Sequence, residues 1–324
     1  MHAVKLFFPH PNETPKSLES VSDNVFWTGA VSRLSVVIPT YRYDASTLID
    51  MLARCAQSSL VEFIVYDDGT RDHEMLARMQ AAAGSARAAI RIVSYPMNRG
   101  PAAVRNAAAE HARAMWVLFL DADMSPDNMA FLEAYLDAEE KLEEPSVVVG
   151  GQSLRFASKE KAFALHRWAS RGDCVSADER RKDPGRYITS SNIMVHRDVL
   201  KACPFDEGFV GWGWESDDWA QKVQSRFPVM HIDNAATHLG LETDKALMAK
   251  YAKAAKNFAR FVKQHPDHAA ALPLYKSVMR KKKGSFSKLF RAMAGGVAAS
   301  RLFPTGLRGR ALKSWQAHIY AEAL

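Results

Sequence analysis

The segment Met115–Asp123, MWVLFLDAD, decides the fold class of this chain. Its apolar run has the length of a strand and carries no charge until the two aspartates, which is typical of a strand buried on both faces of a sheet. Residues i and i+2 of an extended segment point the same way, so both carboxylates can face one point. The segment therefore predicts a buried strand that brings two acidic groups to one edge of a sheet.

Strands and helices alternate on both sides of this segment. The expected strands cover 34–40, 61–68, 90–95, 115–123 and 146–151, and the expected helices cover 45–57, 72–83, 101–114 and 127–141. This order predicts an α/β fold with a Rossmann-like, mostly parallel sheet and helices on both faces. Ligands of such sheets bind beyond the carboxyl ends of the strands. The phosphate-cradling glycine patterns are absent after the first strand, so a metal ion is the natural group to neutralise phosphate.

Composition excludes several classes of protein. The chain has 324 residues, of which 48% are hydrophobic, so it is neither wholly disordered nor collagen-like, and three cysteines are too few for a disulfide-stapled miniprotein. No apolar run is long enough for a membrane-spanning helix, and the first residues do not read as a secretory signal. We therefore expect a cytoplasmic protein, peripheral on the inner face of a membrane where its tail binds lipid.

Four regions follow from the pattern along the chain. We expect an irregular lead-in over 1–32, a regular α/β half over 33–150, a less regular half of the same domain over 151–243, and a helical, basic extension over 244–324. Between His268 and Ala321 there are eleven Lys or Arg residues and no acidic residue. Such a tail suits an anionic membrane surface, and a solvated helix or a protein contact is the alternative. No motif supports nucleic-acid binding.

Several side chains are candidates for chemistry. Asp121 and Asp123 have the oxygens that a hard divalent cation such as Mg²⁺ or Mn²⁺ prefers, although an Asp pair in a loop is more often solvated. His238 is a candidate third ligand, and His231 competes with it. Asp68 ends the second strand and is placed either to accept from a base or to form a turn.

A second group lies at two expected helix starts. Arg99 and Arg105 flank a helix N-terminus, where phosphate is favoured, or form an ordinary exposed helix start. The stretch 211–218, GWGWESDD, places Trp212 and Trp214 beside acidic residues. Flat aromatic rings suit a sugar and a neighbouring carboxylate suits a general base, whereas the alternative is that the acids only cap a helix.

Taken in order, these motifs resemble a known family. The segments VVIPTYRYD, VYDDGTRD, NRGPAAVRNAA, LFLDADMSP and GWGWESDD, with a histidine downstream, resemble an inverting glycosyltransferase of family 2 with a GT-A fold over residues 34–240. The stretch around GWGWESDD is also similar to the acceptor-side segment of the β-1,4-galactosyltransferases. The resemblance implies a nucleotide-diphospho-sugar donor, most often linked to UDP, a divalent metal, and a glycan or lipid-linked saccharide as acceptor.

The resemblance also assigns roles to residues. Residues 33–150 would bind the nucleotide-sugar and 151–243 the acceptor. The nucleotide-sugar would contact Pro39, Thr40, Tyr41, Asp68, Arg99, Arg105 and Asp121, the metal would be held by Asp123 and His238, and Trp212 and Trp214 would contact the acceptor.

One position departs from the family pattern. The family has Glu-Asp in the acidic motif and its Asp is the base, but that Asp aligns with Ser216, which cannot act as a base at neutral pH. Either the alignment slips by one residue or a neighbouring acid takes the role, and we expect Asp217 first and Glu215 second, with Asp218 as a further candidate. The alternative is a non-catalytic nucleotide-sugar or glycan-binding module of the same fold that has lost its base.

Overall fold

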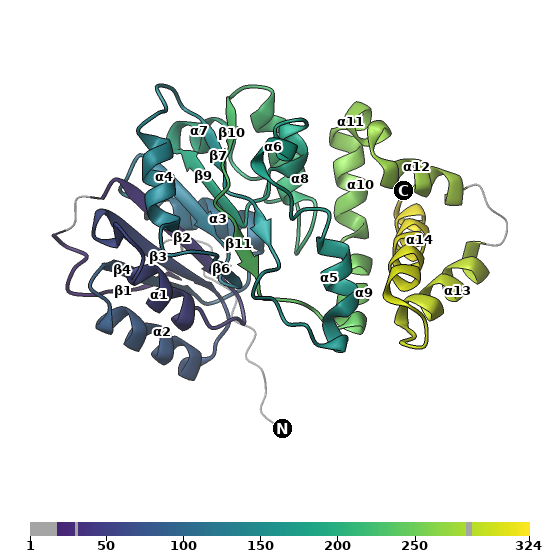
Figure 1. Ribbon diagram of the computed structural model, residues 1–324, viewed down its shortest axis with the longest axis horizontal. Coiled ribbons are helices and arrows are strands. Elements are labelled where there is room, and N and C mark those ends of the chain that lie inside the picture. Colours follow the sequence, from purple (N-terminus) through teal and green to yellow (C-terminus); the bar gives the residue numbers. More distant parts are fainter. Residues whose placement is uncertain (1–17, 30–31, 283–286) are drawn as a thin grey trace.

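The computed structural model describes residues 18–29, 32–282 and 287–324, without the side chains of residues 282 and 287. Figure 1 shows two parts: an α/β unit built around a twisted sheet, and a layer of helices formed by the C-terminal extension. Strand β9 (Asn192–His196) lies near the middle of this sheet, so the two halves of residues 33–243 share one sheet.

The large sheet has eight strands among the described residues. Their order is β1 (Ser20–Asp23), β4 (Ala89–Tyr95), β3 (Val61–Asp68), β2 (Leu34–Thr40), β5 (Trp116–Leu120), β9, β7 (Val147–Val149) and β10 (Val229–His231). The pairings from β4 through β5 are parallel, while β1 and β9 pair antiparallel with their neighbours. The predicted mostly parallel, Rossmann-like sheet is therefore confirmed.

Alternate residues of each strand face opposite layers of helices. Val36, Phe63 and Leu118 pack with α1 (Ser46–Ala53), α2 (His73–Ser85) and α4 (Phe131–Glu139). Val37, Ile64 and Phe119 pack with α3 (Pro101–Ala109), α7 (Arg197–Ala202) and α8 (Glu215–Gln224). Both faces of the sheet are thus covered by helices, as the mainly apolar strands require.

The expected irregular lead-in is wrong for the part of it that the structure describes. Residues 20–23 form β1, which pairs with β4, and Trp27 is buried with the guanidinium of Arg113 4.0 Å from its ring. Glu19 and His111 lie 3.0 Å apart, Oε2 to Nε2. Burial of Trp27 and these polar contacts order the segment, a tertiary effect that local sequence does not carry. Residues 1–17 and 30–31 lie outside the described residues.

A second, three-stranded sheet forms beside the end of β5. The expected strand 115–123 ends at Leu120, because the amide of Asp121 turns to donate to the carbonyl of Ser191 at 3.1 Å. The chain re-enters a sheet as β6 (Met124–Pro126), which pairs with β11 (Ala236–His238), and β11 in turn pairs with β8 (Gln152–Ser153). This sheet brings the second half of the chain to the carboxyl edge of the first.

The C-terminal extension is helical, as predicted, and packs against the α/β unit. It contains α9 (Asp244–Lys253), α10 (Ala255–Gln264), α11 (Pro266–Ala271), α12 (Pro273–Lys282), α13 (Ser287–Ala299) and α14 (Thr305–Ala323). A buried ion pair joins Asp244 to Arg308 at 2.6 Å, and Gly309 of α14 lies against the Trp168 ring of α5 (Ala164–Ser170). None of the helices described is long and apolar enough to cross a membrane.

The shorter elements complete the chain. They are α6 (Ala177–Arg180) and the 3-10 helices η2 (Ser58–Leu60), η3 (Lys161–Phe163) and η4 (Pro184–Tyr187).

Candidate active site

The first carboxylate of the predicted pair is held by a buried arginine. Asp121 follows β5, and its Oδ1 accepts a hydrogen bond from Nη2 of Arg105 at 2.5 Å. Arg105 is only 4% exposed and comes from α3, whose N-terminus faces the same edge of the sheet. Burial raises the pKa of Asp121, while Arg105 opposes this rise and Asp123 adds to it.

The second carboxylate meets the predicted histidine. The register of β11 against β6 places His238 opposite Met124, and Nε2 of His238 lies 3.2 Å from Oδ2 of Asp123. Burial works against ionisation of Asp123, but the hydrogen bond and charge of His238 together with the charge of Lys250 outweigh it, so the pKa of Asp123 is lowered. Asp123 is therefore held as an anion beside an imidazole.

A second histidine supports the first. The ring of His166 in α5 lies edge-on to the ring of His238, with 5.4 Å between centroids. Its Nδ1 accepts from the amide of Glu242 at 2.7 Å, and burial, with the charge of His238, lowers the pKa of His166 to about 4. His166 is thus neutral and orients His238. No pattern in the sequence marked it.

These side chains fit a divalent ion that also binds phosphate. Asp123 offers a carboxylate and His238 an imidazole, and both are partly exposed at the edge of the sheet. Within the ranges that the structure describes, no three His, Cys, Asp or Glu residues converge as a complete metal cage. An open site with few protein ligands suits Mg²⁺ or Mn²⁺, which take their remaining ligands from diphosphate oxygens and water.

The competing histidine is a core residue. His231 is 1% exposed, its Nδ1 accepts from Nε of Arg180 at 3.2 Å, and its Nε2 lies 3.2 Å from the carbonyl of Pro184. Both ring nitrogens are thus taken by the protein. His231 is excluded as a metal ligand.

Asp68 organises the loop that leads into α3. Its buried carboxylate accepts from the amides of Arg99 at 3.0 Å and Gly100 at 2.9 Å, and from Nδ2 of Asn98 at 3.0 Å. The Arg99 guanidinium stacks 3.9 Å from the Tyr95 ring and bonds the hydroxyl of Tyr66. Asp68 and Arg99 therefore shape the loop above the sheet edge, and their contacts to a donor stay a prediction.

The loop after β2 adds a tyrosine to the site. Thr40 is buried and donates to the carbonyl of Tyr43 at 2.5 Å, Pro39 is half-buried, and Tyr41 exposes 41% of its surface. Burial and the charge of Asp123 raise the pKa of Tyr43, so this ring lies close to the carboxylate pair. Tyr43 stands within the segment VVIPTYRYD, but no feature of that segment favours it over Tyr41.

The acidic residues of α8 have three different environments. Glu215 is 6% exposed and accepts from the amide of Gly213 at 2.7 Å. Burial raises the pKa of Glu215, Arg105 opposes the rise, and Asp121 adds to it, so Glu215 lies near the carboxylate pair. The side chain of Asp217 reaches the surface of the protein. Desolvation by the protein atoms around it, and then the charge of Glu215, raise the pKa of Asp217 to about 7.

Asp218 is not a candidate base. It is fully buried, with Nζ of Lys222 2.6 Å from Oδ2 and Nε2 of His265 2.7 Å from Oδ1. The Oδ2 contact lies within α8, and the Oδ1 contact joins α8 to the end of α10. The prediction that Asp218 is catalytic is corrected, because helical spacing turns position 218 toward the core.

The two tryptophans also separate. Trp212 is 45% exposed, stacks on Tyr251 with 5.9 Å between centroids, and has Nζ of Lys250 4.7 Å from its ring. Trp214 is half-buried and packs on Phe258 and Phe261 of α10. Trp212 is exposed, and its contact with an acceptor stays a prediction, whereas Trp214 packs on the C-terminal helices, which argues against its predicted role.

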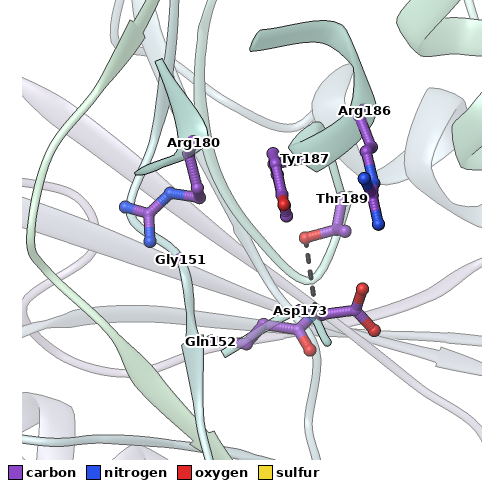
Figure 2. A pocket seen from close by; sticks show the side chains of 7 residues that line it. All are labelled: Gly151, Gln152, Asp173, Arg180, Arg186, Tyr187 and Thr189. Atoms are coloured by element: carbon purple, nitrogen blue, oxygen red, sulfur yellow. Dashed lines mark hydrogen bonds between the residues drawn. The ribbon is translucent and has the colours of Figure 1, made fainter. Parts of the chain in front are cut away.

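A small pocket is lined by residues of β8 and η4, and η4 packs against α8. Ser216 Oγ lies 2.8 Å from Ser190 Oγ, and the neighbouring Thr189 accepts from Nε2 of Gln152 at 3.3 Å. Figure 2 shows Asp173, Arg186 and Tyr187 around the same pocket. The charge of Asp173 contributes to the raised pKa of Asp217, so the pocket and Asp217 belong to one region.

The fold is of the GT-A type, and a comparison with family models gives the family. The chain belongs to the glycosyl transferase family 2, whose model matches residues 35–203. It is 23% identical over 269 residues to the chondroitin synthase of Escherichia coli, covering 68% of this chain and 38% of that protein. The chain therefore spans well under half the length of this relative.

A solved structure shows the same fold. The mannosyltransferase of Pyrobaculum calidifontis, solved with GDP-Man and Mn²⁺, superposes with a TM-score of 0.53 at 16% identity, covering 92% of this chain and 89% of that chain. Residues 1–349 of S. aureus TarS give a TM-score of 0.49 at 16% identity, with 90% of each chain covered.

Proposed function

We propose that this glycosyltransferase is metal-dependent and inverting, and moves a sugar from a nucleotide-diphospho-sugar to a hydroxyl of a glycan or a lipid-linked saccharide. A UDP-linked hexose or N-acetylhexosamine is the proposed donor. The observation that carries the proposal is the meeting of Asp123 and His238, 3.2 Å apart, beside the Arg105–Asp121 pair. The Mn²⁺ and GDP-Man of the Pyrobaculum mannosyltransferase support a metal and a nucleotide-sugar.

On the donor side, Asp123 and His238 would hold the metal ion and Tyr41 would face the nucleoside. When bound, the ion would act as a Lewis acid on the diphosphate and stabilise the charge of the leaving group. Arg105 keeps Asp121 in place, and His166 keeps His238 in place. The chain's own contribution is a pre-ordered, charged edge that costs little reorganisation when donor arrives.

On the acceptor side, Asp217 would remove the proton of the attacking hydroxyl. A single displacement with inversion needs a base on the face of the sugar opposite the leaving group, and a base works best with a pKa near the operating pH. Asp217, with a pKa of about 7, meets that condition and is open to solvent. Glu215 meets it less well, because it is buried and accepts from Gly213.

A second candidate function rests on Ser216. The hydroxyl at the family's base position is engaged with Ser190, 2.8 Å away. A protein of this fold without a working base would bind nucleotide-sugar or glycan and transfer nothing. This binding module and the transferase share a donor site and differ in turnover.

The deciding experiment measures donor binding and turnover separately. We would titrate UDP-, GDP-, CMP- and dTDP-sugars by calorimetry and thermal shift, with and without Mn²⁺, on wild type, Asp123→Ala and Asp137→Ala. Asp137 is an exposed residue of α4 and serves as the matched control. Metal-dependent binding of one nucleotide class, lost only in Asp123→Ala, supports the donor site.

Turnover then separates the two functions. Release of the nucleotide diphosphate in the presence of saccharide acceptors supports the transferase, and loss of that release in Asp217→Asn supports its base. Tight, metal-dependent donor binding with no turnover on any acceptor favours the binding module. If folded protein binds no donor at all, both proposals fail.

A further inference from the structure

Helix α13 exposes its large apolar side chains and packs its small ones inward. Leu289, Phe290 and Met293 are 59%, 55% and 58% exposed. They stand at helical spacings of i, i+1 and i+4, so they form one stripe on the outer surface of the helix. A surface helix normally shows the opposite arrangement, with such side chains turned toward the core.

The inner face explains why this arrangement is built in. A Cβ on Gly295 would lie 2.9 Å from the Trp315 ring of α14, and Ala298 is fully buried. Small residues let α13 approach α14 closely, and this close contact fixes which face of α13 points outward. The stripe is therefore exposed because of how α13 packs on α14, and not because α13 is loosely packed.

The apolar surface continues along the chain into the next turn. Leu302 is 93% exposed and Phe303 is 41% exposed, and both lie between α13 and α14. Leu307, in the first turn of α14, is 47% exposed. The α13 stripe and these three residues together are called the outer apolar surface. Figure 1 shows α13 on the side of the C-terminal layer that lies away from the sheet.

The sequence around this surface is strongly basic. No acidic residue occurs between His268 and Ala321, a span that contains eleven Lys or Arg residues. Lys288 is exposed within the stripe itself, and Lys276, Arg280, Arg310 and Lys313 are exposed on the neighbouring helices. Arg291 and Arg301 are instead bound to Glu322 and Asp244. A protein partner would need acidic side chains placed to match these Lys and Arg residues, whereas an anionic lipid surface presents negative headgroups at every position.

We infer that the outer apolar surface docks on an anionic phospholipid bilayer. Leu, Phe and Met side chains would enter the boundary between headgroups and acyl chains, and the surrounding Lys and Arg would lie among the lipid phosphates. The contact is interfacial and needs no helix that crosses the bilayer. It places the enzyme where an acceptor carried on lipid would be met.

The test uses the full chain and vesicles of defined composition. We would measure co-sedimentation with phosphatidylcholine vesicles and with vesicles containing about 30% phosphatidylglycerol, at low and high salt. The variants are Leu289→Ser/Phe290→Ser/Met293→Ser and Lys288→Glu. Their matched controls change exposed residues of the α/β unit, Val25→Ser/Met129→Ser and Lys141→Glu. Thermal melting establishes that every variant is folded.

We expect wild type to partition at least about ten-fold better onto the anionic vesicles, with weaker binding at high salt. The triple variant should lose at least about ten-fold and Lys288→Glu about five-fold or more, since it reverses a charge, while both controls bind as wild type. Absent binding by wild type, or equal loss in the controls, overturns the proposal. It is also overturned if wild type is a dimer in solution that the triple variant makes monomeric, because the stripe would then be an interface between copies.

Discussion

Gly240 lies so close to Asp123 that a Cβ on the glycine would fall 2.1 Å from Oδ2 of the aspartate. Gly240 follows β11 by two residues, so the strand that supplies His238 also leaves the space for the carboxylate. Backbone, carboxylate and imidazole are thus fitted together at the proposed metal site.

This contact predicts the effect of Gly240→Ala. The carboxylate of Asp123 must move to admit the methyl group, so its position relative to His238 is lost. We expect the affinity for Mn²⁺, measured by calorimetry in the presence of UDP, to fall at least about ten-fold, as for changes beside a metal ligand. The control is Gly84→Ala in α2, where a Cβ meets nothing within 4 Å. Equal Mn²⁺ affinity in Gly240→Ala and wild type would contradict the proposed ligand.

A second prediction concerns the pH dependence of transfer. Asp217 must be ionised to act as a base, and its pKa is about 7. We therefore expect kcat to rise with pH through about 7 and to level off above it, and Asp217→Asn to lower kcat by about 10²–10⁴-fold with little change in donor affinity. Steady-state kinetics from pH 5.5 to pH 9, a range spanning roughly two pH units about that pKa, measure both. If Asp217→Asn keeps the wild-type kcat, Asp217 is not the base and Glu215 becomes the candidate.

The same carboxyl predicts a change of stability with pH. Its pKa is about 7 in the folded protein and about 3.9 in an unfolded chain, so the unfolded state releases the proton first. Ionisation therefore costs the folded state stability as pH rises from about 4 to about 7. We expect Asp217→Asn to raise the melting temperature at pH 8 and to leave it almost unchanged near pH 4. Differential scanning calorimetry measures these melting temperatures. A variant that melts below wild type at pH 8 would show that the folded protein stabilises the carboxylate.

Replacement of Trp212 and replacement of Trp214 should have different effects on acceptor binding and on stability. Trp212→Ala removes an exposed ring, so KM for the acceptor should rise while the melting temperature holds. Trp214→Ala removes a ring that packs on Phe258 and Phe261, so the free energy of unfolding should fall by about 2–3 kcal/mol, below the value for a fully buried aromatic residue. Chemical denaturation and acceptor titrations distinguish the two. Matching losses of stability in both variants would mean that Trp212 is also structural.

Much of this arrangement was predictable from the sequence, for reasons that differ between residues. The apolar runs predicted the strands that end at Asp68 and near Asp121, because parallel strands buried on both faces are mainly apolar. The motif order predicted His238, although only the β6–β11 register brings it to Asp123. Asp218 and Trp214 were misplaced because α8 and α10 pack together, and no short segment records which helix covers which. His166 and Lys250 were missed for the same reason.

Lys250 gives the last prediction, since it connects the C-terminal extension to the proposed donor site. Its Nζ lies 4.7 Å from the Trp212 ring and 3.5 Å from Oε1 of Glu242, and its charge helps to lower the pKa of Asp123. A cation there would attract the donor diphosphate and hold the Trp212 ring.

We therefore expect Lys250→Gln to raise KM for the nucleotide-sugar about five- to twenty-fold, the worth of one partly exposed charge-assisted contact, and to leave the melting temperature within about 2 °C. Lys245→Gln, an exposed lysine at the start of the same helix, is the matched control and should behave as wild type. Lys250→Gln could instead leave KM for the nucleotide-sugar unchanged and raise only KM for the acceptor. Lys250 would then act through Trp212 alone, and the extension would affect acceptor binding but not donor binding.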